Sequence, residues 1–512
     1  MAQWCFHTRR IAWSRGFAVV SVVTDEVRSR LADCLGNRPG LERNPWIPHI
    51  FPKERAVARK RKLKHSSKKK AVQEVVHPNA AGIDIGAEEN WVAVPPDRDE
   101  QPVRSFGCFT EDLHTVAQWL EACGIDTVAM EATGVYWVPL YQILEGYGFE
   151  VYLVNARHVK KVPGRKTDVL DCQWLQQLHS FGLLAASFRP ADEICVLRSY
   201  WRHRDNLIRY AAGHVQHMQK ALEQMNVQLH KVIDDVTGVT GLRIIDAILA
   251  GERDRQKLAT LRDYRIKSGQ DRIAKALEGD YRPEHLFSLG QALASYRFYQ
   301  EQIAQCDHQI EAYLSTLDTR VDPSQTPLPP LKRKNRSSNE PGFDLRTHLY
   351  RISGVDFVQI ESLGVITVQT ILSEVGLDPS KFPTQKDFCS WLTLCPDPRI
   401  TGGNVKSTTT RKSKNRAAKA FRMAAQSLAH SSGPLGAYYR RMRARIGPSE
   451  AITAAAHKIA RIFYQLWSLP QPYDPEQLIR HQHQHTQRQI NSLRKRARSF
   501  GFELVPQLAA TQ

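Results

Sequence analysis

The sequence predicts an α/β domain followed by a largely helical remainder, and three observations support this fold class. Short apolar strands alternate with amphipathic helices from Asn79 onward. Apolar residues then recur at steps of three and four along two long stretches, the spacing of a coiled-coil seam. The last third contains Gly-punctuated and Ala-rich segments with helical periodicity. We therefore expect a mixed-sheet domain, long coiled-coil helices and a mostly helical C-terminal domain.

Composition indicates the class of partner. The 512 residues include 71 Lys and Arg against 52 Asp and Glu, a formal net charge of +19. Such a surface attracts polyanions, so nucleic acid is the first partner expected. Nine cysteines occur without a C-x-x-C pair, which argues against a disulfide framework or structural zinc. Because no apolar run reaches the roughly 18 to 20 residues of a membrane helix, we expect a soluble cytoplasmic protein without a membrane partner.

The α/β domain is expected to begin with a hairpin of "AAGIDIG" and "NWVAVP", followed by a third strand in "VRSFGCF". Thr110 is expected to cap a helix through "DLHTVAQWLEACG", and "DTVAME" is expected to be a buried strand. A helix over "VPLYQILEGYG" and a strand in "EVYLVNA" then complete a mixed sheet.

Four carboxylates take distinctive positions along these elements. Asp84 lies mid-strand, where a charge is normally excluded unless it is paired or metal-bound. Glu131 ends its strand, at the edge where open α/β sheets place sites, and Asp168 and Asp171 share one face of the next helix. Converging carboxylates repel without a cation, and their hard oxygens suit Mg²⁺ or Mn²⁺. Turn, helix-start or N-cap roles remain open for Asp84, Glu131 and Asp168 taken singly.

The segment before Asp168, "RHVKKVPGRK", is strongly basic. We expect it to bind phosphates beside the acidic residues. The candidate nucleic-acid contacts in this loop are Lys160, Lys161, Arg165 and Lys166.

Three segments, "NAAGIDIGAEENWVAV", "MEATGVYW" and "NARHVKKVPGRKTDVLDCQWLQ", resemble the Asp-Glu-Asp-Asp (DEDD) transposase domain of the insertion-sequence 110/1111 family. The resemblance covers residues 79–190 and implies a ribonuclease H-like, RuvC-type fold. It also implies that Asp84, Glu131, Asp168 and Asp171 form a catalytic, metal-binding tetrad. "GIDIGAEE" additionally resembles the first phosphate loop of actin-like ATPases and sugar kinases, but the second phosphate loop and the adenosine loop of that fold are not found.

Two seams follow the α/β domain, one from Ile208 to Val232 and one from Leu289 to Leu317. Helices with such seams form an antiparallel hairpin within one chain or pair between subunits. The coiled-coil insertion of the family that the chain resembles favours the second arrangement, a homodimer or homotetramer.

The C-terminal third carries two further motifs. "GVDFVQIESLGVITVQTILSEVG" places a Gly between two apolar helical runs, in the manner of a helix-hairpin-helix that offers backbone N–H groups to phosphate. A basic, Gly-rich loop follows and leads into an Ala-rich helix. The candidate nucleic-acid contacts here are Lys406, Arg411, Lys412, Lys414 and Arg416.

A hydroxyl in this basic loop suits attack on a phosphodiester, because cations lower the cost of the alkoxide. A loop that only contacts the DNA backbone explains the same residues. Residues 345–470 resemble the family's second transposase domain, which supplies a nucleophilic serine before a Gly pair. Thr401 takes that place here, and its β-methyl group crowds the attack, so Ser407 is the second candidate.

The resemblance implies a DNA transposase or recombinase of a bacterial insertion sequence, associated with the nucleoid. Its implied chemistry is Mg²⁺-dependent strand cleavage and exchange with a covalent intermediate, guided by an element-encoded bridge RNA. A structure-selective junction endonuclease without that intermediate, and an inactive DNA-binding relic, remain alternatives. The expected segments are an N-terminal extension with a basic arm (1–78), the DEDD domain (79–190), the coiled-coil region (191–320), a linker (321–344), the C-terminal transposase domain (345–470) and a basic helical tail (471–512).

Overall fold

The computed structural model describes residues 74–132, 134–155, 168–330 and 339–505. The predicted basic arm and the loop residues Lys160, Lys161, Arg165 and Lys166 lie outside these ranges. Among the described helices, none is long and apolar enough to cross a membrane. The seven cysteines in the same ranges are free thiols.

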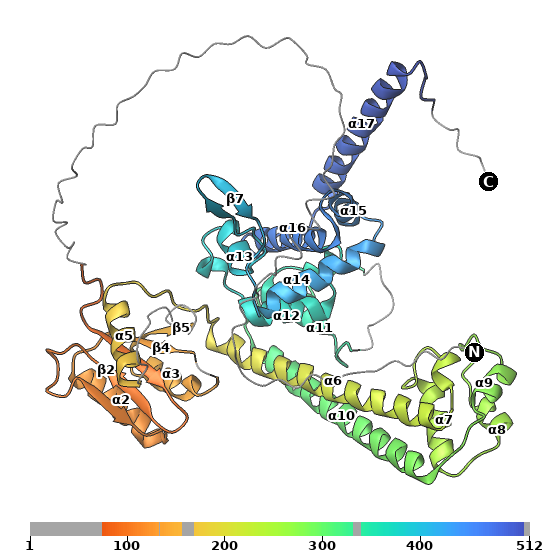
Figure 1. Cartoon of the computed structure of the whole chain (residues 1–512), viewed down its shortest axis with the longest axis horizontal. Helices are drawn as coiled ribbons and strands as arrows, with labels where there is room; N and C mark the ends of the chain where they lie inside the picture. The colour runs from red at the N-terminus through yellow and green to blue at the C-terminus, as the bar shows by residue number, and fades with distance from the viewer. Residues whose placement is uncertain (1–73, 133, 156–167, 331–338, 506–512) are drawn as a thin grey trace, which may run out of the picture. The chain divides into compact units, whose positions relative to one another are not determined.

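Five strands form one mixed sheet in the order β3-β2-β1-β4-β5 (Figure 1). β2 pairs antiparallel with β1 and β3, whereas β4 and β5 run parallel to β1. Each strand coincides with a predicted one, because short apolar runs bounded by turn residues specify buried strands. The strands are β1 (Ala80–Ile85), β2 (Asn90–Ala93), β3 (Val103–Phe106), β4 (Thr127–Glu131) and β5 (Glu150–Val154).

In the described part of this domain, the helices that accompany the sheet are α2 (Thr110–Ala122), α3 (Trp137–Gly146) and α5 (Asp168–Ser180). Apolar residues of α2 and α3 share a buried core with Ile83 and Met130. Thr110 is the first residue of α2, so its prediction as the N-cap is wrong. Phe109 takes the cap position, and its N–H donates to the Asp112 carboxylate at 3.1 Å.

The sheet face opposite the Ile83 core is closed by α5, and a glycine makes this contact possible. A Cβ at Gly82 would overlap with backbone atoms of Cys172 and Gln176. Only a residue without a side chain therefore lets the helix backbone lie this close to β1.

We expect Gly82→Ala to lower the free energy of unfolding by about 1–3 kcal/mol, because overpacking forces α5 away from the sheet. Gly213→Ala in α6 is the matched control, since a Cβ there meets no atom within 4 Å and alanine favours a helix. Thermal unfolding of the two variants checks the expectation. An equal melting temperature for both would contradict the tight contact.

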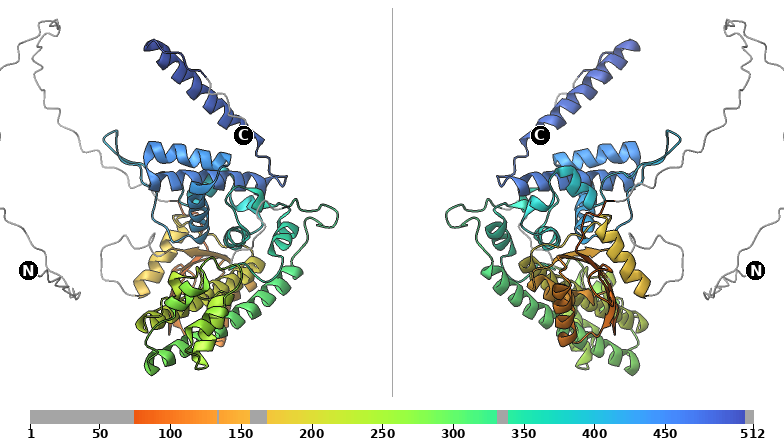
Figure 2. Two further views of the ribbon diagram at one scale, coloured as in Figure 1. Left: turned by 90° about the vertical axis from the view of Figure 1, so that its right-hand side faces the viewer. Right: turned by 90° about the vertical axis from the view of Figure 1, so that its left-hand side faces the viewer.

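Two long helices, α6 (Asp192–Gln224) and α10 (Pro283–Thr316), lie side by side within the chain (Figures 1 and 2). Seam residues such as Met218, Leu222 and Leu293 are buried in one cluster. The same cluster holds apolar residues of the three short connecting helices, which are α7 (Val239–Leu249), α8 (Arg255–Thr260) and α9 (Gln270–Ala276).

The first seam stops earlier than predicted. α6 ends at Gln224, and Asn226 adopts a left-handed conformation with φ of 57°. Asparagine tolerates this conformation, which closes a helix. Leu229 and Val232 therefore lie in the turn region after α6, although both are buried.

The C-terminal region is mostly helical, as predicted, and its core is aromatic. Phe357, Phe388, Phe421 and Phe463 are all buried in one cluster. Seven helices build the region: α11 (Leu345–Ser353), α12 (Val365–Val375), α13 (Gln385–Trp391), α14 (Arg416–Ser427), α15 (Pro434–Ile446), α16 (Pro448–Ser468) and α17 (Glu476–Ser499).

Of the two helical runs expected around Gly364, only the second forms an α-helix, α12. The first contains a single 3₁₀ turn, Phe357–Gln359, and the positive φ of 78° at Ser362 prevents a helix from continuing to Gly364. The Ala-rich helix is confirmed as α14, which the Asn415 side chain caps by accepting from the Ala418 N–H at 3.0 Å.

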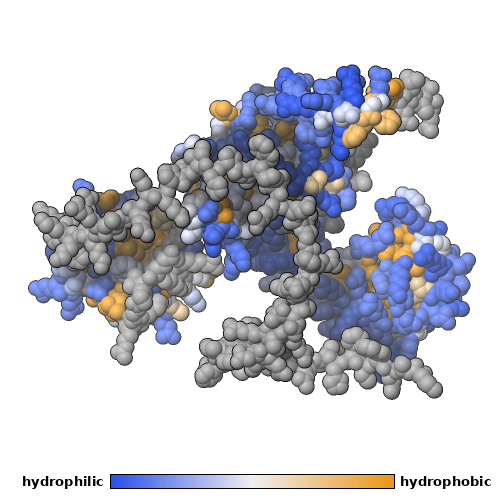
Figure 3. Space-filling model, turned by 45° about the horizontal axis from the view of Figure 1, so that its top comes forward, coloured by the Kyte–Doolittle hydropathy of each residue, from blue (hydrophilic) through white to orange (hydrophobic). Residues whose placement is uncertain are grey.

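One end of each long helix packs into the aromatic core. Leu197 of α6 and Ile310 of α10 belong to it. Trp201 donates its indole N–H to the Thr370 hydroxyl at 2.9 Å. Ion pairs support this junction: Arg202 forms a bidentate pair with Glu374, Arg198 lies 3.7 Å from the same carboxylate, and the buried Arg204 pairs with Asp307. Most of the coloured surface visible in Figure 3 is hydrophilic, in keeping with apolar side chains gathered in these cores.

Candidate active site

Neighbouring parallel strands place two of the four predicted carboxylates. β1 and β4 pair in constant register from Ala80 opposite Thr127 to Ile83 opposite Met130. The next residue is Asp84 on β1 and Glu131 on β4. Both side chains are half-buried. The register therefore puts the two carboxylates at adjacent positions on the same edge of the sheet.

The two carboxylates share the sheet face that α5 covers. Side chains alternate along a strand, so Asp84 faces the same side as Gly82, where α5 packs. Gln176 of α5 donates to the Ala80 carbonyl at 3.3 Å, at the start of β1. The helix therefore runs antiparallel to β1, and its first turn lies toward Asp84.

That first turn carries the other two predicted acids. Asp168 is the first residue of α5, and Asp171 follows in the same turn with a half-buried side chain. The side chain of Asp168 lies outside the described part of the chain. The backbone therefore places all four acidic residues at the same end of β1. The structure describes the side chains of Asp84, Glu131 and Asp171.

The pKa of the Cys172 thiol reflects burial and the negative charges nearby. Burial raises the pKa of this thiol to about 12, and the negative charges of Asp84 and Asp171 contribute further. Negative neighbours disfavour a thiolate, so Cys172 is an inert buried group. Because both carboxylates act on the same sulfur, the end of β1 and the first turn of α5 are close enough to interact electrostatically.

Carboxylate oxygens are the ligands that Mg²⁺ and Mn²⁺ prefer, so the chemistry of the donor set suits these ions. Within the described ranges, no group of three or more His, Cys, Asp and Glu side chains is arranged to hold a metal. The fourth carboxylate, that of Asp168, falls outside that search. A metal site at the tetrad therefore stays a prediction.

The other end of α5 is fixed by a buried histidine. His179 is fully buried and its Nε2 lies 2.9 Å from the Thr127 hydroxyl, which itself donates to the Glu150 carbonyl. Because the Thr127 hydroxyl proton is already donated to that carbonyl, the Thr127 oxygen accepts a hydrogen bond from the Nε2–H of His179. Burial lowers the pKa of His179 to about 4, with the charge of His77 adding to the effect.

This shift predicts a pH-dependent stability. The folded state holds His179 neutral, whereas the unfolded side chain takes up a proton below about pH 6.5. We expect a stabilisation of up to about 3 kcal/mol that is complete above pH 6.5 and lost as the pH falls toward 4. His179→Gln should flatten the melting temperature between pH 7 and 5, and His481→Gln on the exposed face of α17 is the control. An unchanged pH profile in His179→Gln would rule out this contribution.

The expected Gly-rich loop contains a two-stranded hairpin that was not predicted. β6 (Arg399–Thr401) pairs antiparallel with β7 (Asn404–Ser407). Gly402 and Gly403 connect the strands with φ values of 57° and 78°. Two consecutive left-handed residues form the two-residue turn that matches the twist of a hairpin.

The two candidate nucleophiles lie at opposite ends of this hairpin. Thr401 is exposed beside the turn and pairs with Asn404. Ser407 is half-buried at the base, where its hydroxyl lies 3.0 Å from the Thr409 hydroxyl and accepts from the Thr409 N–H at 3.3 Å. Thr401 is therefore the more accessible hydroxyl for a large substrate.

The candidate basic residues around the hairpin fall into two groups. Lys406, Lys412 and Lys414 are exposed. Arg411 donates to the Ser390 carbonyl at 2.8 Å, and Arg416 pairs with Asp205 at 3.4 Å. The three lysines thus offer charge to solvent, whereas the two arginines also hold the hairpin region in place.

Comparison with family models identifies both halves of this arrangement. A model described as a transposase, the DEDD type of the IS110 group, matches residues 81–227. A second, described as "Transposase IS116/IS110/IS902 family", matches residues 357–440. The chain belongs to the IS110 family of transposases. A search of curated proteins found no match.

The matched ranges coincide with the two predicted sites of this IS110-family enzyme. The first contains the four acidic positions, and the second contains Thr401 and Ser407. The chain is therefore a DNA transposase whose carboxylates and candidate hydroxyls come from separate family domains.

Proposed function

We propose that this transposase cleaves and exchanges DNA strands with a divalent metal held by Asp84, Glu131, Asp168 and Asp171. The observation that carries this proposal is the register of β1 with β4, which makes Asp84 and Glu131 neighbours beside the first turn of α5. We further propose that the sheet is of the ribonuclease H-like, RuvC type. Its order, with β1 between an antiparallel and a parallel neighbour, supports that assignment.

A bound Mg²⁺ or Mn²⁺ would neutralise the carboxylates and polarise the phosphodiester. The four side chains would position it through their oxygens. Asp84 and Glu131 are supplied by rigid strands, and Asp168 and Asp171 by a helix fixed at Gly82 and His179. Rigid support of this kind favours precise placement of a reacting phosphate.

The hydroxyl of Thr401 is the proposed nucleophile, with Ser407 second. Thr401 Oγ1 would form a new bond to phosphorus and lose its proton, while the bond from phosphorus to the leaving deoxyribose oxygen breaks and that oxygen takes up one proton in exchange. The covalent protein–DNA ester conserves the phosphoester for rejoining to a second strand. Exposure of Thr401 beside a tight turn suits approach to duplex DNA, and the neighbouring Lys406 supplies positive charge.

The proposal also includes partners that the family implies: a homodimer or homotetramer, a structured guide RNA and a place on the bacterial nucleoid. The net charge of +19 supports binding of either nucleic acid.

One assay tests the whole proposal. Purified full-length chain is incubated with element-end and target DNA, with and without co-expressed flanking RNA, in Mg²⁺ or in EDTA. We expect joined strands only with both Mg²⁺ and the RNA. Equal exchange in EDTA would contradict the metal site, and equal exchange without RNA would contradict the guide.

A further inference from the structure

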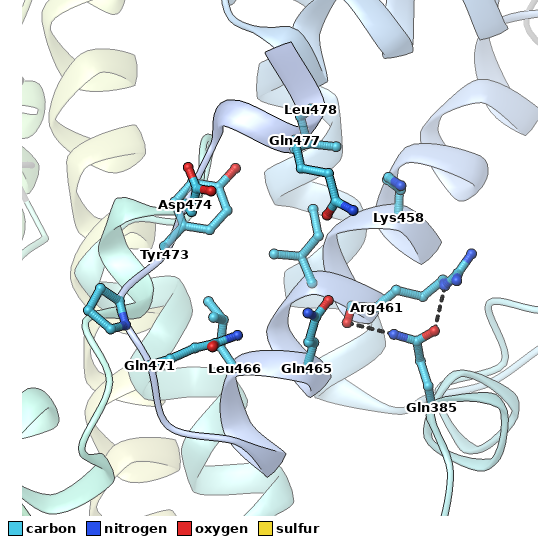
Figure 4. Close-up of a pocket in the computed structure, with 12 residues that line it drawn as sticks. Gln385, Lys458, Arg461, Gln465, Leu466, Gln471, Tyr473, Asp474, Gln477 and Leu478 are labelled. Carbon is cyan, nitrogen blue, oxygen red and sulfur yellow. Dashed lines mark hydrogen bonds between the residues drawn. The ribbon is translucent and has the colours of Figure 1, made fainter. Parts of the chain in front are cut away.

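A cavity of about 310 Å³ lies between α13, α16 and the segment leading into α17 (Figure 4). Four amide side chains line it: Gln385, Gln465, Gln471 and Gln477. Each amide offers both donors and an acceptor. The volume lies at the lower end of the range of small-ligand sites.

Two cations of α16, Lys458 and Arg461, form one side of the cavity. Lys458 is half-buried, and burial lowers its pKa, with the charge of Arg461 adding to the effect. Arg461 donates to the Gln385 side chain at 2.7 Å, and Gln385 donates back to the Arg461 carbonyl at 2.9 Å (Figure 4). No described residue forms an ion pair with Lys458 or Arg461. This part of the lining carries positive charge that an anion would neutralise.

The opposite side differs in character, with Tyr473 and Asp474 (Figure 4). Burial, together with the charges of Glu361 and Asp474, raises the pKa of Tyr473 to about 12, so its phenol stays protonated. A carboxylate in the lining disfavours a bare phosphate. A nucleobase, by contrast, presents amine donors to carboxylates and a mixed edge to glutamine amides.

A second cavity of about 280 Å³ adjoins the first, and Lys458 and Leu478 line both. Tyr438, Arg441 and His481 also line it. Lys458 therefore lies between two cavities of similar volume. A phosphate that links two successive nucleotides would lie at such a position.

We propose that these cavities bind unpaired nucleotides of a nucleic-acid strand, with a base among the glutamine amides and the linking phosphate at Lys458 and Arg461. The proposal deepens, and rests on, the strand-exchange function, because exchange exposes unpaired segments. Both unpaired DNA and unpaired RNA have this chemistry.

The test measures fluorescence anisotropy of short single-stranded deoxyribo- and ribo-oligonucleotides with the full-length chain. We expect Lys458→Gln to weaken binding about tenfold, the effect of one charge-assisted contact. Gln465→Trp should weaken it comparably, because the indole fills the cavity without changing the net charge. The tighter of the two oligonucleotides identifies the source of the strand.

Matched controls are Lys275→Gln on α9 and Gln489→Trp on α17, both at exposed positions. Thermal melts confirm that all four variants fold, and Gln465 is itself exposed, so its replacement tests the cavity even if Lys458→Gln is destabilised. Binding by Lys458→Gln and Gln465→Trp equal to that of their controls would overturn the proposal. So would an equal loss of binding to blunt duplex DNA. Asp84→Asn should bind these oligonucleotides normally, which separates failure of the cavity from failure of the acidic site.

Discussion

Asp84→Asn is expected to abolish Mg²⁺-dependent strand cleavage while salt-sensitive DNA binding survives. The substitution removes one negative charge and nearly preserves shape, so the loss falls on metal-assisted chemistry. We expect a reduction of roughly a hundredfold or more, the scale on which single electrostatic contacts to a transition state act. Cleavage of labelled element-end DNA and a filter-binding assay at several salt concentrations measure the two properties.

Asp97→Asn is the matched control, because Asp97 belongs to the same domain and its side chain is 77% exposed. Asp171→Asn should behave like Asp84→Asn. Cleavage at the parental rate in Asp84→Asn would remove the carboxylate from the catalytic assignment.

The second large effect is expected at the β6–β7 hairpin. Thr401→Ala should lose the covalent protein–DNA adduct, because no oxygen remains to attack phosphorus. Thr401→Ser should match or exceed the parent, since the crowding β-methyl group is gone. Denaturing electrophoresis of labelled DNA detects the adduct. Thr408→Ala, at a neighbouring exposed position, is the control.

Ser407→Ala should have a mild effect if Thr401 is the nucleophile. An adduct that persists in Thr401→Ala and disappears in Ser407→Ala would transfer the role to Ser407. If neither the parent nor Thr401→Ser traps DNA while metal-dependent nicking continues, a junction endonuclease replaces the covalent mechanism.

The sequence predicted the α/β elements well because their signals are local. Each strand is a short apolar run, and Asp84 and Glu131 were placed correctly on β1 and at the end of β4. Their adjacency depends on strand register, and the approach of α5 depends on the missing side chain of Gly82. Strand register and the approach of a helix depend on tertiary packing, which a single sequence suggests but does not specify.

Other features have weaker signals in the sequence. Gly402 and Gly403 form a hairpin turn between two short strands, but each strand carries a single apolar residue, so the local pattern is also typical of a loop. Asn226 marked the end of α6, yet the apolar spacing continued beyond it. The cavity beside Lys458 combines residues from three separate elements, so nothing in the spacing along the chain predicted it.

The paired helices α6 and α10 connect two separate hydrophobic cores. One end is set in the aromatic core and secured by Arg204 and Asp307, whereas the other end belongs to the cluster that contains Met218. At 1.5 Å per residue, the 33 residues of α6 span about 50 Å. Removing seven residues from each helix would preserve the seam spacing and bring the two cores about 10 Å closer. Helix length therefore sets the separation of the aromatic core from the cluster that contains Met218.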